Sequence, residues 1–241
     1  MCTVTLTPLP YDKRGFVITS NRDEAPGRET LPPKFYHEEG QKMLFPKDVL
    51  AGGTWLGLSE QKRGVCLLNG GFKKHFRKSR YRLSRGVVVK HLLAAEDFQK
   101  ATEDYDFSEI EPFTIVALDW QQGLMFFELV WDGEKSHFRN LPLQPHIWSS
   151  SPLYSEEMKQ LRESWFLDFR RKNELQPENL LEFHTSAGIG DENLDIIMDR
   201  GFVKTLSVSQ IVHFKGKIKF YYKNLVTGEV SKMSFSEEVW M

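Results

Sequence analysis

The chain has 241 residues, which fits one large domain or two small ones, and we predict a single domain over residues 1–241. Hydrophobic residues make up 40% and charged residues 27%, an ordinary globular composition without repeats or low-complexity tracts. The 32 basic and 33 acidic residues leave a formal net charge of −1, so no global field favours nucleic acid or an anionic membrane as a partner.

The start of the chain lacks the basic end and apolar run of a signal peptide. No apolar run approaches the roughly 18 residues of a membrane helix. The two cysteines, Cys2 and Cys66, are too few for a disulfide framework and suit a reducing compartment. We therefore expect a cytoplasmic protein without a membrane span, in which Cys66 is a buried core residue.

The first predicted element is a β-hairpin. Residues 3–9 alternate polar or β-branched with apolar side chains, and residues 15–20 form a second strand-like run after turn residues. The second strand runs out into four polar side chains at residues 21–24. A hairpin of this length brings that cluster back beside Cys2, although a solvated strand end explains the same pattern.

The next segment, residues 25–50, is rich in proline, glycine and charge, which predicts a long surface excursion bordering a site. Two strands follow, at residues 51–59 and 64–69, and the first carries Trp55 among closely spaced glycines. Asn69 ends the second strand. Its amide is able to point out of the sheet edge, or it simply begins a turn with the glycine that follows.

A basic stretch runs from Lys73 to Arg85, with seven Lys and Arg residues and no acidic one. With Phe76 and Tyr81 interleaved, such a stretch is able to bind phosphates or stack on single-stranded bases. Because it is brief and the rest of the chain is balanced, we interpret it as a solvated linker and expect no nucleic-acid partner. Ser84 is a suitable N-cap for a helix over residues 85–95.

In the second half of the chain we predict strands, then helices, then further strands. Its predicted strands are residues 113–118, 124–131, 136–141, 146–151, 203–214, 217–224 and 230–235, and its predicted helices are residues 155–172 and 177–184. The strands at 113–118 and 124–131 are apolar on nearly every position, so both of their faces should be covered. These elements predict an α+β fold, a four-layer αββα sandwich of two antiparallel sheets with helices outside.

Cys2 becomes the N-terminal residue if Met1 is removed. It would then carry an α-amino group that titrates near roughly pH 8 and a thiol that titrates near roughly pH 8.5. One residue would thus supply both a nucleophile and the base that activates it, as in N-terminal nucleophile hydrolases. The alternative is a chance cysteine that serves as a small apolar residue.

Several separated motifs share the order and approximate spacing of one family. They are Met1-Cys2, Ser-Asn-Arg-Asp-Glu at residues 20–24, Gly-Gly-Thr-Trp-Leu-Gly at 52–57, Leu68-Asn69, and Ser84-Arg85-Gly86. Over about its first 95 residues the chain resembles the NRDE family, the relatives of transport and Golgi organisation protein 2. The resemblance implies an αββα sandwich of the N-terminal nucleophile type, distantly related to penicillin V acylase and bile salt hydrolase.

The resemblance also implies catalytic roles for Cys2, Arg22, Asp23 and Asn69. By analogy, Cys2 attacks an amide carbonyl and its own amino group relays the proton. Asp23 orients that amine, and Arg22 stabilises the thiolate or a substrate carboxylate. Asn69 offers an N–H to the oxyanion. The reaction would split a linear amide through a thioester and needs no metal or organic cofactor.

Asn21, Trp55 and Ser150 are the candidate substrate-binding residues, with Ser150 standing where the related acylases carry an asparagine. Arg22 and Asp23 are adjacent, whereas two residues separate the corresponding pair in those acylases, so on a strand they should point to opposite faces. These residues are consistent with two functions of the chain toward a small-molecule partner. The chain is either an amidohydrolase that uses Cys2, or a catalytically silent protein that binds a hydrophobic or amphipathic ligand in the same pocket.

Overall fold

The computed structural model describes residues 3–240, so Met1, Cys2 and Met241 lie outside the described residues. The described chain divides into two compact units that interleave along the sequence. The first unit contains residues 3–27, 144–149 and 154–239, and the second contains residues 28–143, 150–153 and Trp240. The single domain predicted for residues 1–241 stays a prediction.

The first unit is built on a six-stranded antiparallel sheet with the strand order β10-β1-β2-β11-β12-β13. Its strands are β1 (Thr3–Pro8), β2 (Phe16–Glu24), β10 (His146–Ser149), β11 (Lys204–Phe214), β12 (Lys217–Asn224) and β13 (Val230–Ser236), followed by the short 3₁₀ helix η1 (Glu237–Trp240). The predicted hairpin is confirmed, since Val4 of β1 lies opposite Ser20 of β2 and the Leu9 N–H donates to the Gly15 carbonyl.

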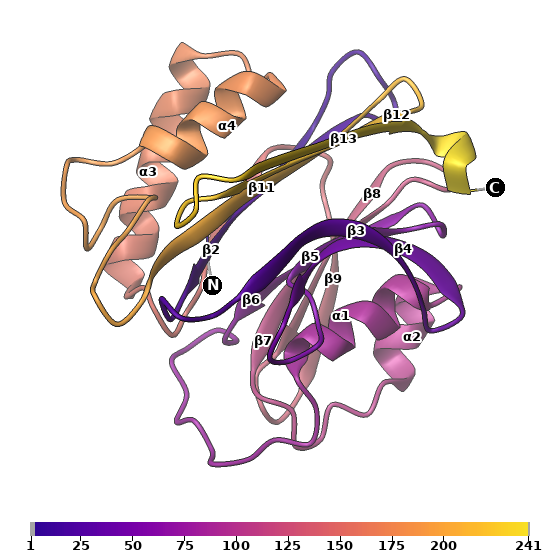
Figure 1. Ribbon diagram of the computed structural model, residues 1–241, viewed down its shortest axis with the longest axis horizontal. Helices are drawn as coiled ribbons and strands as arrows, with labels where there is room; N and C mark the ends of the chain where they lie inside the picture. Colours follow the sequence, from indigo (N-terminus) through magenta and orange to yellow (C-terminus); the bar gives the residue numbers. More distant parts are fainter. Residues whose placement is uncertain (1–2, 241) are drawn as a thin grey trace. The chain divides into compact units, whose positions relative to one another are not determined.

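Two helices, α3 (Glu156–Lys172) and α4 (Pro177–Ser186), lie on one face of this sheet (Figure 1). Ser155 caps α3 as predicted, because its hydroxyl accepts a hydrogen bond from the Met158 N–H at 3.3 Å. Helix α3 packs against β10, and α4 packs against β2 and β11. The core below the helices comprises Leu9, Val17, Phe166, Leu180, Phe183, Ile196 and Val212.

The second unit is built on a seven-stranded antiparallel sheet with the strand order β3-β4-β5-β6-β7-β8-β9. Its strands are β3 (Thr30–Glu38), β4 (Gln41–Asp48), β5 (Leu56–Ser59), β6 (Arg63–Asn69), β7 (Phe113–Asp119), β8 (Met125–Trp131) and β9 (Ser136–Leu141). Helix α1 (Arg85–Ala94) packs on β5 and β6, and α2 (Phe98–Asp104) packs on β9. The prediction of α1 is confirmed, whereas α2 was not predicted.

The surface excursion predicted for residues 25–50 is wrong, because most of this segment forms the hairpin of β3 and β4. Gly40 supplies the left-handed conformation of its turn, with φ of 71°. Pro32 and Pro33 fall where the pairing register shifts, and β3 is the edge strand of its sheet. Proline is tolerated at such positions, since an edge strand need not donate every N–H to a neighbour.

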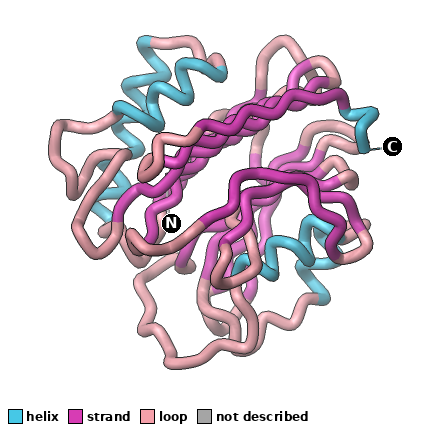
Figure 2. The backbone as a smooth tube through the Cα atoms, in the orientation of Figure 1, coloured by secondary structure: helices cyan, strands magenta, loops and turns pink. Residues whose placement is uncertain are grey.

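The segment between β6 and α1 has no regular secondary structure and is drawn as a long loop (Figure 2). Most of the basic stretch from Lys73 onward runs through this loop. In the described part of the chain no helix combines the length and the hydropathy that a membrane crossing requires. The α+β class with two antiparallel sheets is confirmed.

Helix α1 lies close to the chain that leads into β5, because two glycines meet there. A Cβ atom on Gly53 would lie 2.5 Å from the Gly86 carbonyl carbon, and one on Gly86 would lie 2.9 Å from the Thr54 nitrogen. The Thr54 N–H donates to the Gly86 carbonyl at 3.3 Å. Both glycines belong to the motifs that carry the family resemblance. The close approach of two backbone segments explains why these motifs contain glycine.

We expect Gly53→Ala to lower the free energy of unfolding by about 1–3 kcal/mol, because the added methyl meets backbone that cannot rotate aside. Urea unfolding followed by circular dichroism measures the change. Gly27→Ala is the matched control, since its Cβ would meet no atom within 4 Å. Equal losses of stability in the two variants would contradict the close contact between Gly53 and Gly86.

Candidate active site

A buried carboxylate lies near the end of β2, in the polar cluster of residues 21–24. Asp23 is 1% exposed. Its Oδ2 accepts a hydrogen bond from the Tyr154 hydroxyl at 2.6 Å, and its Oδ1 accepts one from the Thr205 hydroxyl at 2.7 Å. Burial, and next the negative charge of Asp23, raise the pKa of Tyr154 well above 10, so Tyr154 stays protonated and donates. The carboxylate is thereby held in one orientation.

Arg162 of α3 joins this carboxylate to the start of β1. Its guanidinium carbon lies 3.7 Å from the centre of the Tyr154 ring. Its Nη1 donates to the Thr3 hydroxyl at 2.6 Å, and its Nη2 donates to the carbonyls of Leu194 at 3.0 Å and Asp195 at 2.6 Å. One network of side chains therefore fixes both the Asp23 partner Tyr154 and the first described residue of the chain.

Arg22 lies on the opposite face of the sheet from Asp23, as strand alternation predicts. In the register Asp23 is opposite Thr205 and Arg22 is opposite Ser207, with a bulge between the two pairs. Arg22 is buried and shares its face of β2 with Ser20. Ser20 is in turn paired with Val4 of β1, which is two residues from Cys2 in sequence.

The Asn21 side chain is fully buried against α4. Its Nδ2 donates to the His184 carbonyl at 2.9 Å, and its Oδ1 accepts from His184 Nδ1. His184 Nε2 then accepts from the Thr5 hydroxyl at 2.8 Å. The Asn21 amide thereby ties α4 to strands β1 and β2, and its role in substrate binding stays a prediction.

Sequence reasoning missed Tyr154, Arg162 and His184, which organise this region. None of them belongs to a motif. For Arg162 a signal exists, because it falls on the helix face that buries Phe166, four residues further on. A charged residue on an apolar helix stripe is costly unless it is bonded, which points to an internal network.

The remaining candidates lie in the second unit. Asn69 ends β6, and its Oδ1 is buried without a hydrogen-bond partner in the described part of the chain. Ser150 is 1% exposed, and its Oγ likewise has no partner among residues 3–240. The turn after Asn69 contacts the segment after Ser150, since Ser151 Oγ donates to the Gly71 carbonyl at 2.5 Å. Two buried polar groups that are able to bind a ligand are thus found on adjoining segments.

Trp55 is 2% exposed, and its role in substrate binding stays a prediction. It packs in the core of the second unit, where its carbonyl accepts from the Leu67 N–H at 2.8 Å. Cys66 is fully buried, as predicted. Cys2 lies outside the described residues. Among residues 3–240, no group of three or more His, Cys, Asp or Glu side chains is arranged to hold a metal ion.

The fold matches that of solved N-terminal nucleophile hydrolases. An ortholog of N-acylethanolamine-hydrolyzing acid amidase from Caenorhabditis elegans gives a TM-score of 0.59 at 10% identity, over 87% of this chain and 92% of that one. Penicillin V acylase from Agrobacterium tumefaciens gives 0.56 at 10% identity, over 97% and 86%. A variant of conjugated bile acid hydrolase from Clostridium perfringens gives 0.53 at 12% identity, over 96% and 92%. The likeness shows the predicted αββα fold class.

The family follows from the sequence. Residues 1–196 match the Transport and Golgi organisation 2 family, so the chain belongs to this family. The resemblance drawn from the separated motifs is thereby confirmed. A comparison with curated proteins finds no significant match.

The buried His184 predicts a dependence of stability on pH. Burial, with a smaller effect of the Arg162 charge, lowers the pKa of His184 from 6.5 to about 3. Between these values the unfolded chain binds a proton that the folded chain does not. This histidine therefore makes the free energy of unfolding fall as pH is lowered from 6.5 towards 3, by up to about 1.4 kcal/mol per pH unit.

We expect His184→Gln to be less stable than wild type at pH 7 but to lose less further stability on acidification to pH 5. Urea unfolding at several pH values measures both slopes, and the exposed His37→Gln serves as the control. An NMR titration of the wild-type imidazole gives a second measurement. A His184 ring that titrates near pH 6.5 in the folded protein would refute the assignment.

Proposed function

We propose that this protein is an N-terminal cysteine amidohydrolase that cleaves linear amide C–N bonds in the cytoplasm after removal of Met1. The observation that carries the proposal is the buried Asp23 carboxylate, which is connected through Tyr154 and Arg162 to Thr3. Thr3 is the residue that follows Cys2 in the sequence. An amine at residue 2 requires a fixed anionic partner, and Asp23 has the burial and the hydrogen bonds to be one.

In the proposed reaction the Cys2 sulfur attacks the carbonyl carbon of the amide and a C–S bond forms. The α-amine of Cys2 takes the thiol proton and passes it to the amide nitrogen, the C–N bond breaks, and the amine leaves. Water then attacks the thioester. The C–S bond breaks, and the products are a carboxylic acid and the regenerated thiol.

Each proposed role has a physical reason. Asp23 orients the α-amine, and the cationic Arg22, on the face of β2 that also carries Ser20, stabilises the thiolate or a substrate carboxylate. The resemblance assigns Asn69 to the oxyanion, and the buried Asn69 and Ser150 side-chain oxygens that lack partners in the described chain support polar contacts with a ligand. Asn21, Trp55 and Ser150 are the proposed substrate-binding residues, and Asn21 also positions α4.

The activities for which the similar solved proteins are named support the substrate class, since these proteins are an acid amidase, an acylase and a hydrolase. The competing function is a catalytically silent protein that binds a hydrophobic or amphipathic ligand. Removal of Met1 and reactivity of Cys2 separate the two functions.

We expect intact-mass measurement of protein isolated from cells to show loss of Met1, and chloroacetamide to alkylate Cys2 in preference to Cys66. The reason is that Cys66 is fully buried, whereas a thiol beside an amine and a cation forms a reactive thiolate. Peptide mapping locates the label. Cys66→Ser should leave the labelling unchanged and Cys2→Ser should abolish it. Retention of Met1 would exclude the proposed mechanism.

We expect Asp23→Asn to slow hydrolysis of chromogenic linear N-acyl amides by about 10²-fold or more, because the amide side chain no longer provides an anion for the amine. The matched control is Asp168→Asn, which changes an exposed carboxylate on α3. The pH dependence of Cys2 alkylation is a second readout that a purely structural role would leave unshifted. Equal activity and equal pH profiles in the two variants would remove Asp23 from the mechanism.

A further inference from the structure

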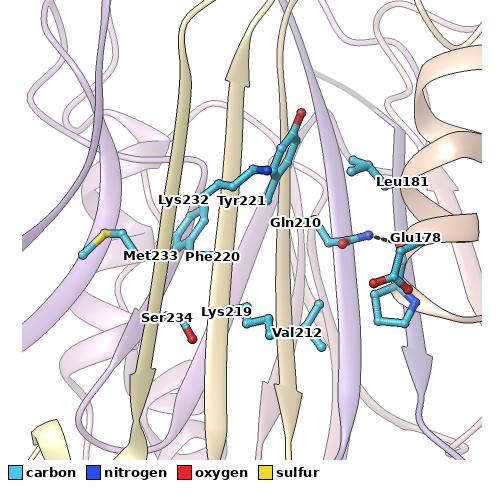
Figure 3. Close-up of a pocket in the computed structure, with 11 residues that line it drawn as sticks. Glu178, Leu181, Gln210, Val212, Lys219, Phe220, Tyr221, Lys232, Met233 and Ser234 are labelled. Carbon is cyan, nitrogen blue, oxygen red and sulfur yellow. Dashed lines mark hydrogen bonds between the residues drawn. The ribbon is translucent and has the colours of Figure 1, made fainter.

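A groove lies in the first unit beside α4. The helix packs on β2 and β11, and beside it two adjoining hollows of about 380 and 440 Å³ extend over β12 and β13. Figure 3 shows the residues that line the smaller hollow. Both hollows are lined by Pro177, Glu178, Val212, Lys219 and Ser234, and we call them together the α4 groove. Their volumes fall within the roughly 300–1,000 Å³ range of small-molecule sites.

The sheet register places the groove residues on one face. Val212 is opposite Lys219, which is opposite Ser234 on β13. Because pairs directly across neighbouring strands project to the same side, the three side chains form one row across the sheet. The parallel row contains Tyr221 and Lys232. Figure 3 shows these strand residues on one side of the groove and α4 on the other.

The wall formed by α4 is fixed to the sheet. Gln210 of β11 donates through Nε2 to the Pro177 carbonyl at 2.8 Å and to the Thr19 hydroxyl at 3.0 Å. Pro177 is the first residue of α4 and presets its helical φ. The distance between helix and strands is therefore set before any ligand arrives, which lowers the entropic cost of binding.

The groove combines an apolar lining with lysines, one of which, Lys232, lies over the Tyr221 ring at 5.9 Å from its centre. Apolar surface comes from Leu9, Pro177, Leu181, Val212 and Phe214. Lys217, Lys219 and Lys232 also line it, against the single carboxylate of Glu178. Among the described residues no ion pair joins Glu178 to any of these lysines. Three cations against one anion leave the groove positive.

We propose that the α4 groove binds an amphipathic anion, with an alkyl chain along the apolar lining and a carboxylate or phosphate head group held by the three lysines. A neutral lipid would leave the lysines unused, and a small inorganic anion would leave the apolar surface uncovered.

This site is separate from the proposed catalytic residues. The groove lies on the helix-covered face of the sheet, beside Gln210, which is opposite Thr19 of β2. Arg22 is on the other face, and Asp23 shares the helix-covered face but lies further along β2, opposite Thr205. The inference does not depend on turnover at Cys2.

Calorimetric titration of the full chain with decanoate, decyl phosphate and decanol, each below its micellar concentration, tests the proposal. We expect both anions to bind and decanol to bind at least about tenfold more weakly, and the ratio of the two anion affinities identifies the preferred head group. Amide NMR shifts should locate the decanoate on β12, β13 and α4. Cys2→Ala should bind decanoate as wild type does, which separates this site from the proposed catalytic one.

Two variants probe the groove. Replacing Lys217, Lys219 and Lys232 together by Gln should weaken decanoate binding at least about fivefold, and Ser234→Trp should abolish it by filling the groove from an exposed position. The charge-matched control replaces the exposed Lys34, Lys100 and Lys135 by Gln.

Val230→Trp is the steric control, since Val230 lies on β13 but does not line the groove. Wild-type affinity in both controls, with losses in both groove variants, supports the site. Decanol binding as tight as decanoate binding, equal loss in the two triple variants, or NMR shifts confined to other surfaces would overturn it.

Discussion

The structure of the first unit depends on placing a carboxylate where water does not reach it. An isolated buried Asp23 would cost several kcal/mol, so its hydrogen bonds have to be supplied from inside. Tyr154 and Thr205 supply them from segments more than a hundred residues away in sequence. The Arg162 guanidinium then lies over the Tyr154 ring and donates a hydrogen bond to the Thr3 hydroxyl. Removing one member exposes the others to the same desolvation cost, which makes the network cooperative.

The two faces of the same sheet carry different functional groups. The helix-covered face carries Asp23, Asn21 with its bonds to His184, and the α4 groove, and helices α3 and α4 or the segments flanking them supply one partner or wall to each. The other face carries Arg22. A strand delivers alternate residues to opposite environments, so the adjacent residues Arg22 and Asp23 serve different surroundings without any change of backbone.

Local sequence patterns predicted most elements but few contacts. Alternation and turn residues identified the strands, and Ser155 marked the start of α3, because these signals act over a few residues. Pro32 and Pro33 misled the reading of β3, since only the sheet order reveals an edge strand. The burial of Asn21 and Trp55 could not be predicted from the local sequence either. Burial depends on partners that lie far along the chain, such as His184 for Asn21.

The interleaving of the two units along the chain has a consequence for biosynthesis. Strand β1 pairs with β10, and β2 pairs with β11, so the first sheet joins Thr3 to Ser149 and Asp23 to Thr205. At roughly 5–20 residues per second, a ribosome releases these later strands many seconds after β1 emerges. During that interval β1 lacks two-thirds of its sheet and the arginine of α3. Strand β1 is therefore nascent chain for many seconds before the strands and the arginine that hold it in the sheet are made.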